Sequence, residues 1–136
     1  MEQDNLNKLL IDDMAISIAR DGGVDTIKML TSKVGCKINM KNNEGNTMLY
    51  YACLDGDLDV VQLLIAKDAD INITNKKGLA PIHAACIGNR LDIIEFLVES
   101  GVDTTKKTGK SGLTAHDLVE FWNPKDQKSL DLLKSG

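Results

Sequence analysis

The fold of this chain is predicted most directly by Gly78-Leu79-Ala80-Pro81-Ile82-His83-Ala84-Ala85-Cys86. The preceding residues, Asn75-Lys76-Lys77, form a tight turn readily, and Gly78 completes it. Pro81 then stands where a helix can begin, because the N–H that proline lacks would have no partner in the first helical turn. The segment therefore predicts a turn followed by a short helix.

The sequence around this segment repeats. Residues 39–71 align with residues 72–104 at a shift of 33, and most apolar positions exchange one aliphatic side chain for another. Nine positions are identical: Asn39/Asn72, Asn42/Asn75, Gly45/Gly78, Ala52/Ala85, Cys53/Cys86, Leu58/Leu91, Asp59/Asp92, Leu64/Leu97 and Asp70/Asp103. Units of this length fill nearly all of the 136 residues.

Each unit is predicted to contain two helices. Residues 47–54 read as a helix of about two turns with Thr47 as its N-cap. Residues 58–67 place Leu58, Val61 and Leu64 on one apolar face. Neither helix can bury that face alone, so the units must stack.

These segments resemble the ankyrin repeat, whose pattern is Gly-x-Thr-Pro-Leu-His-x-Ala-Ala, then Val-Val-x-Leu-Leu-Leu, then Gly-Ala-Asp-Val-Asn. The second part of the pattern appears here as Asp59-Val60-Val61-Gln62-Leu63-Leu64-Ile65, and the third as Asp68-Ala69-Asp70-Ile71-Asn72. A further copy begins at Gly112-Leu113-Thr114-Ala115-His116-Asp117-Leu118, with Leu130, Leu132 and Leu133 in its second helix.

The resemblance implies an all-α ankyrin-repeat solenoid of about four stacked helix-turn-helix units with β-hairpin-like connecting loops. Residues 1–136 form a single domain on this interpretation. Residues 1–38 are a degenerate N-terminal capping repeat, 39–71 and 72–104 are the second and third repeats, and 105–136 are the C-terminal capping repeat.

Three residues depart from the family pattern. Asp68 and Asn89 stand at helix ends where the family has glycine with positive φ, a conformation that Asn tolerates better than Asp. His116 stands where the family has a buried Leu, so either the last unit is looser or this histidine has a partner.

Composition narrows the function. The formal charge of −4 counts against phosphate neutralisation, so no nucleic-acid partner is expected. No apolar run reaches membrane-spanning length, and Met1-Glu2-Gln3-Asp4-Asn5 lacks the features of a signal peptide. We expect a cytoplasmic protein, with the nucleus also possible. The three cysteines, Cys36, Cys53 and Cys86, do not form the even set of a disulfide scaffold.

No phosphate loop or metal site is predicted. The Gly109-Lys110-Ser111 sequence ends like a phosphate loop, but Thr104 stands where such a loop needs its first glycine. A metal site at His83, Cys86 and Cys53 is also disfavoured. The resemblance implies instead that the cysteines occupy a small buried position and that the ring of the histidine bonds to backbone.

Catalysis is not expected either, because His83 and His116 fall in neighbouring units without a nucleophile motif, and Asp55 and Asp57 lie in a surface turn. We therefore expect no enzyme, no cofactor and no metal. Asn72 matches the acceptor of asparaginyl hydroxylases that modify ankyrin repeats, although the same residue also stabilises the loop in this family.

The resemblance implies that a partner protein binds to a concave surface lined by loop tips and first helices. Ser111, Gly88 and Phe121 belong to these positions. The predicted partner-binding residues are Asn43, Glu44, Asn46, Leu54, Asp55, Lys76, Lys77, Leu79, Ile87, Lys110, Leu113 and Trp122.

Among them, Leu54, Leu79, Ile87 and Leu113 are predicted to form an exposed apolar stripe with Trp122 beside it. The alternative for the aromatic pair, Phe121 and Trp122, is that it caps the open end of the stack. The lysines at the tips favour a partner with an apolar strip flanked by acidic groups.

The predicted function is a monomeric, non-catalytic adaptor or scaffold that binds another protein. Two alternatives stay open. The chain is a regulatory, inhibitory or chaperone-like subunit of a larger complex, or it is the ankyrin part of a larger enzyme or lipid-binding protein.

Overall fold

The computed structural model of the chain describes residues 25, 28, 38–42, 44–55 and 58–134. The predicted capping repeat 1–38 therefore lies outside the described residues except for Asp25, Lys28 and Ile38, and Asn43, Cys36 and Asp57 also lie outside them. The described part contains helices α3 (Met48–Asp55), α4 (Leu58–Ala66), α5 (Pro81–Ile87), α6 (Leu91–Glu99), α7 (Ala115–Trp122) and α8 (Gln127–Lys134).

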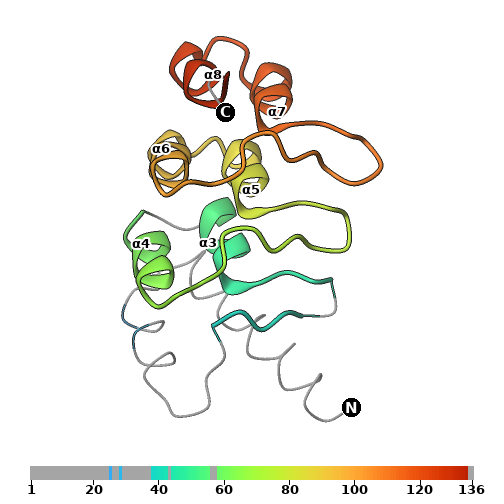
Figure 1. Ribbon diagram of the computed structural model, residues 1–136. Helices are drawn as coiled ribbons and strands as arrows, with labels where there is room; N and C mark the ends of the chain where they lie inside the picture. The colour runs from blue at the N-terminus through green and yellow to red at the C-terminus, as the bar shows by residue number, and fades with distance from the viewer. Residues whose placement is uncertain (1–24, 26–27, 29–37, 43, 56–57, 135–136) are drawn as a thin grey trace.

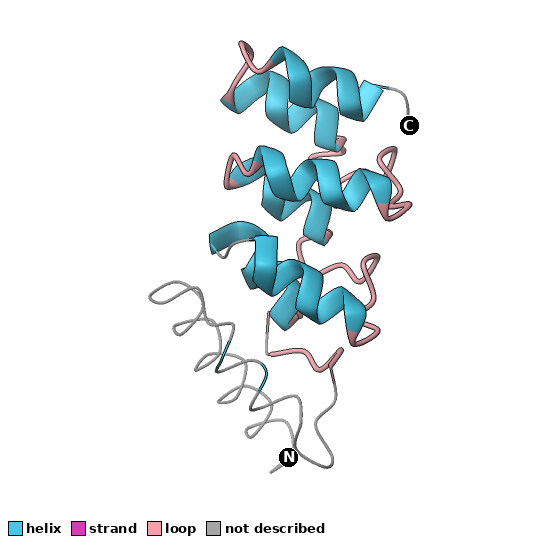
Figure 2. Cartoon of the chain, turned by 90° about the vertical axis from the view of Figure 1, so that its left-hand side faces the viewer, coloured by secondary structure: helices cyan, strands magenta, loops and turns pink. Residues whose placement is uncertain are grey.

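These helices form three antiparallel pairs, stacked one above the other (Figures 1 and 2). Helices α3, α5 and α7 contact one another in an inner column, and α4, α6 and α8 form an outer column. Long loops precede the inner helices and project on the same side of the stack (Figure 1). The prediction of an all-α solenoid of helix pairs is confirmed.

The inner helices begin where their capping residues predict. The Oγ1 of Thr47 accepts a hydrogen bond from the backbone N–H of Tyr50, and Pro81 is the first residue of α5. In the last unit Thr114 caps α7, because its Oγ1 accepts from the N–H of Asp117 while the Asp117 carboxylate accepts from the N–H of Thr114. Short polar side chains and one proline thus define the starts of all three inner helices.

Two residues that replace a glycine of the repeat pattern have the positive φ that the sequence predicts. Asp68 has φ of 69° and Asn89 has φ of 56°. Both residues follow a helix, and both reverse the chain in the left-handed region that L-residues avoid.

The core is continuous along the stack and contains little aromatic volume. Ala52 and Cys53 of α3, with Ala85 and Cys86 of α5, are buried along the inner column. The outer helices add Val60, Val61, Leu64, Ile93, Ile94 and Leu97. Small side chains on the inner column let neighbouring helices approach closely, so each unit buries its apolar face against the next.

The loops are tied to one another across the units. The Oδ1 of Asn75 accepts from the N–H groups of Lys77 and Leu79, and its Nδ2 donates to the Oδ1 of Asn46 in the preceding loop. Backbone hydrogen bonds join Lys76 N–H to the Glu44 carbonyl and Gly109 N–H to the Lys77 carbonyl. The loops are therefore hairpin-like and form a ladder, although the described residues contain no β-strand.

None of the helices in the described part of the chain is long and apolar enough to cross a membrane.

Candidate protein-interaction surface

The exposed large hydrophobic side chains belong to the inner helices and to the loop before α7. Among the described residues they are Ile87 and Leu113, each 37% exposed, Phe121, 73% exposed, and Trp122, 62% exposed. Three are at the ends of the inner helices α5 and α7, and Leu113 is in the loop before α7. The described residues of the outer helices contribute none.

The predicted apolar stripe is only partly exposed. Ile87 and Leu113 are exposed as expected, whereas Leu54 and Leu79 are half-buried because both side chains pack against the core. The expectation that all four leucine and isoleucine side chains are exposed was therefore too broad. The apolar surface is instead concentrated toward the C-terminal units.

Phe121 and Trp122 form an aromatic pair with a T-shaped contact, their ring centroids 5.1 Å apart and their planes at 85°. Neither ring belongs to the core, to which α7 contributes Ala115, Leu118 and Val119. Most of each side chain is therefore exposed to solvent. Such an exposed pair is typical of an interface anchor.

Two clefts run along the loop tips, and none of the four exposed hydrophobic side chains lines either of them. The first, of about 330 Å³, is lined by Glu44, Asn46, Tyr50, Asn75, Lys76, Lys77 and Leu79. The second, of about 700 Å³, is lined by Lys76, Lys77, Gly109, Lys110 and Ser111. The two clefts share Lys76 and Lys77 as lining residues, and we call the two clefts together the lysine groove.

The other predicted partner-binding residues differ in how much of their side chain is exposed to solvent. Glu44 and Asp55 are exposed. Asn46 is only 5% exposed, and its amide donates to the Tyr51 hydroxyl at 2.9 Å and to the Glu44 carboxylate at 3.2 Å. Asn46 therefore holds the loops together and leaves little of itself to a partner. Asn72 is exposed, as a modification site would require.

The sequence did not single out Tyr50, Asn75 or Gly109 as lining residues of this surface. Asn75 had a detectable signal, because it is identical to Asn42 one repeat earlier. The position of Gly109 depends on the packing of consecutive loops, which no local pattern specifies.

His83 bonds to backbone through both of its ring nitrogens. Its Nδ1 accepts from the N–H of Ala80 and its Nε2 donates to the carbonyl of Lys106, both at 2.9 Å. Burial lowers the pKa of this histidine, so the ring is neutral. Because both ring nitrogens are already bonded to backbone, neither has a lone pair left for a metal ion.

The two described cysteines are buried and free. Burial raises the pKa of Cys86 to about 12 and that of Cys53 further in the same direction. The reactive thiolate form is therefore absent at neutral pH, and both residues act as small hydrophobic side chains.

His116 does have a partner, Glu120, one helical turn further along α7. The distance from its Nδ1 to the nearer carboxylate oxygen is 3.9 Å. With Asp117, these residues place three donor atoms within 4.8 Å of one another. Asp117 is already engaged as the cap of α7, and its pKa is lowered by the Thr114 N–H. The i, i+4 spacing of the histidine and the glutamate was the available signal for this pair.

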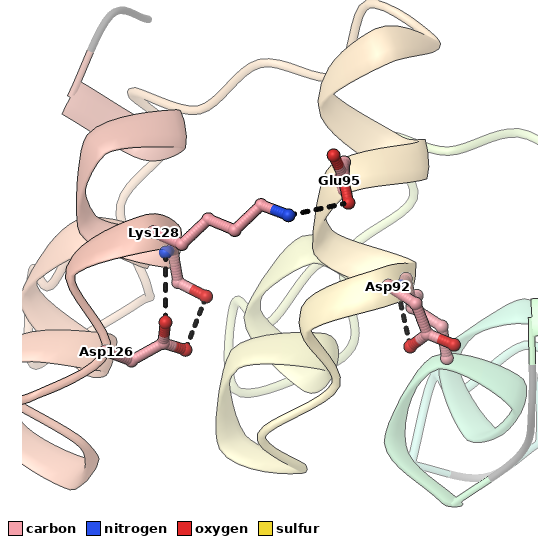
Figure 3. Close-up of polar contacts among 6 residues, drawn as sticks. Asp92, Glu95, Asp126 and Lys128 are labelled. Atoms are coloured by element: carbon pink, nitrogen blue, oxygen red, sulfur yellow. Dashed lines mark hydrogen bonds and ion pairs between the residues drawn. The ribbon is translucent and has the colours of Figure 1, made fainter.

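The outer side of the stack is polar and bonded within itself (Figure 3). Lys128 of α8 reaches across to Glu95 of α6 at 3.9 Å. At the start of α8, the Asp126 carboxylate accepts from the N–H and the hydroxyl of Ser129. The Asp92 carboxylate accepts from the N–H of Ile93 on α6. This side offers a partner charged and polar groups but no exposed large hydrophobic side chain among its described residues.

Comparison with known families identifies these units. Residues 14–108 match the family model described as ankyrin repeats (3 copies). Comparison with curated proteins finds no match. Ankyrin repeats generally mediate protein–protein interaction and are typically non-catalytic. The match covers more than half of the chain, and the helix pairs, projecting loops and buried histidine agree with it, so this chain belongs to the ankyrin-repeat family.

Proposed function

We propose that this chain is a non-catalytic adaptor that binds a segment of another protein with its loop tips and inner helices. The binding surface consists of the lysine groove and the exposed apolar side chains Ile87, Leu113, Phe121 and Trp122. The chain acts as a monomer in the cytoplasm or nucleus under this proposal.

The observation that carries the proposal is that the exposed large hydrophobic side chains of the described residues all belong to the inner helices or to the loop before α7. Isolated exposed leucines or isoleucines need no explanation, but an adjacent Phe and Trp that are both mostly exposed do. Aromatic residues in that position offer a large contact area and are enriched at the energetic centres of protein interfaces. The outer helices, with no such group in the described part of the chain, serve as the scaffold.

An affinity capture from the native cell tests the proposal. The chain is compared with a double variant, Ile87→Asp plus Phe121→Asp, which places two charges on the apolar surface. Phe121 is 73% exposed and Ile87 lies outside the buried core, so the variant should fold with some loss of stability, and circular dichroism with thermal unfolding verifies this. We expect the variant to lose the proteins that the original chain captures.

A matched control carries the same added charge on the outer side, as Gln62→Asp plus Ser100→Asp. Both of these residues are exposed, on α4 and directly after α6. The control should retain the captured proteins. Equal capture by the chain and both variants would refute the proposed surface.

A further inference from the structure

Three lysines of the lysine groove have no carboxylate partner among the residues that the structure describes. Lys76, Lys77 and Lys110 are exposed, and none forms an ion pair with any carboxylate in the described part of the chain. The outer side differs, because Lys128 there is paired with Glu95. In a chain of net charge −4, these unpaired cations form a local basic strip.

Two of these lysines occupy equivalent positions in consecutive loops. Lys76 precedes Gly78 as Lys110 precedes Gly112, and both glycines have positive φ at the turn. The hydrogen bond from Gly109 N–H to the Lys77 carbonyl, 3.1 Å, holds the two loops side by side. The lysines therefore recur with the period of the stack.

Each of the two loops that carry these lysines also carries a leucine. Leu79 and Leu113 occupy equivalent positions, each at the end of its loop where the inner helix begins. Leu79 lines the same cleft as Lys76 and Lys77, and Leu113 is exposed outside the clefts. A partner segment in the first cleft therefore meets the cations of Lys76 and Lys77 and the aliphatic side chain of Leu79.

The period of the stack matches that of an extended peptide. Packed helices of neighbouring units are about 8–10 Å apart, so equivalent positions recur at about that distance. A polyproline-type segment has three residues per turn and rises about 3.1 Å per residue, so one face recurs about every 9 Å. Acidic residues at every third position would therefore face successive loops.

From these observations we infer that the lysine groove binds an extended acidic peptide segment, with Asp or Glu at positions i and i+3 opposite Lys76 and Lys110 and apolar residues between them. This inference rests on the proposed function and specifies the chemistry of its partner. Glu44 lines the groove at the N-terminal side, so the segment is neutral or basic where it passes that residue.

Fluorescence anisotropy tests the inference with a labelled peptide of about nine residues, long enough to cross the groove. Two Glu residues three positions apart face Lys76 and Lys110, and Pro and Leu fill the other positions. Comparison peptides carry the same residues with all Glu in one block, or Lys in place of Glu. We expect the spaced peptide to bind most tightly and the Lys peptide not to bind. The affinity of the spaced peptide should fall at high salt, because salt screens the charges.

The lysines are tested by the double variant Lys76→Glu plus Lys110→Glu. We expect it to weaken binding of the spaced peptide by about tenfold or more, because two attractive charges become repulsive. The control, Lys125→Glu plus Lys134→Glu, makes the same change in net charge at exposed positions before and within α8. It should change the affinity by less than about twofold, as expected of charges outside the contact.

Three results would overturn the inference: equal loss of peptide affinity in both lysine variants, tighter binding of the blocked than of the spaced peptide, or preference for a single-stranded oligonucleotide of equal charge.

The proteins captured from the native cell distinguish this inference from the proposed adaptor function. If capture is lost in the Ile87→Asp plus Phe121→Asp variant but unchanged in Lys76→Glu plus Lys110→Glu, the adaptor function stands and the acidic partner does not. If neither variant changes capture, both proposals fail.

Discussion

The imidazole of His83 donates from Nε2 to the backbone carbonyl of Lys106 at 2.9 Å, and this bond joins one repeat to the loop of the next. The carbonyl can only accept, so the proton is on Nε2, and Nδ1 is free to accept from the N–H of Ala80. One buried side chain thus orients the start of α5 and holds the following loop. Lys110 of the basic strip and Leu113 belong to that loop, so a buried side chain supports part of the proposed binding surface.

Replacing His83 with Ala should lower the free energy of unfolding by about 2–4 kcal/mol, because it removes two hydrogen bonds and leaves the Ala80 N–H and the Lys106 carbonyl buried without them. Urea denaturation measures the change. His116→Ala is the control, since that side chain is half-buried and has only a long contact to Glu120. It should cost less than about 0.5 kcal/mol. Similar losses in both variants would contradict the role assigned to His83.

Stability should fall as the pH drops below about 6.5, the ordinary pKa of histidine in an unfolded chain. Burial lowers the pKa of folded His83, and the charge of Lys106 acts in the same direction, although the hydrogen bond to the Lys106 carbonyl opposes them. The unfolded state therefore binds a proton that the folded state does not, and this favours unfolding. The contribution is fully present above that pH and is lost below it.

Urea titrations between about pH 7.5 and pH 5 measure this slope while the carboxylates stay ionised. The pKa values of Asp117 and Asp103 are lowered, so these carboxylates become protonated, and stop contributing to the stability of the fold, only at more acidic pH. The His83→Ala variant should have a flatter profile over the same range. An unchanged slope in that variant would assign the pH dependence to another group.

Asp68→Gly should stabilise the chain by roughly 0.5–1 kcal/mol, because φ of 69° strains Asp but not glycine. Asn89 has φ of 56°, but its Oδ1 accepts from the Nδ2 of Asn123 at 3.0 Å. Asn89→Gly loses this bond between repeats and should gain less. The midpoints of chemical denaturation compare the two variants, and a midpoint for Asp68→Gly at or below that of the original chain would contradict the strain argument.

Gly78→Ala should destabilise the chain more than Gly101→Ala. Both glycines have positive φ, 77° and 88°, so each substitution incurs a strain of about 1–2 kcal/mol. A Cβ at Gly101 meets no atom within 4 Å, whereas at Gly78 it would lie 2.3 Å from the backbone nitrogen of Gly109. The Gly78 variant must push two loops apart, so it should also weaken peptide binding in the lysine groove. Equal thermal shifts in the two variants would show that the loops are not in close contact.

The fold was predictable because its signals are local. Thr47, Pro81 and Thr114 lie at the helix starts that their side chains favour, and Asp68 and Asn89 turn the chain where the pattern has glycine. The second helix of the second repeat ends at Ala66, one residue earlier than expected. A period of 33 residues then specifies how such units stack, since equivalent apolar faces must cover one another.

The binding surface was less predictable, because exposure depends on the neighbouring unit. Ile87 and Phe121 occupy equivalent positions at the ends of their inner helices, yet the first is 37% and the second 73% exposed. Local patterns could not separate them, nor establish that Phe121 and Trp122 are left out of the core. They also could not show that Lys76 and Lys77 line one groove with Lys110, more than 30 residues away.

The sequence alone thus determined the repeat, the helix pairs and their caps, because these depend on propensities and apolar periods within one unit. Only the tertiary structure decided which side chains remain available to a partner. That choice depends on what the adjacent repeat covers and on how the loops approach one another, and both are properties of the stack that no single unit contains.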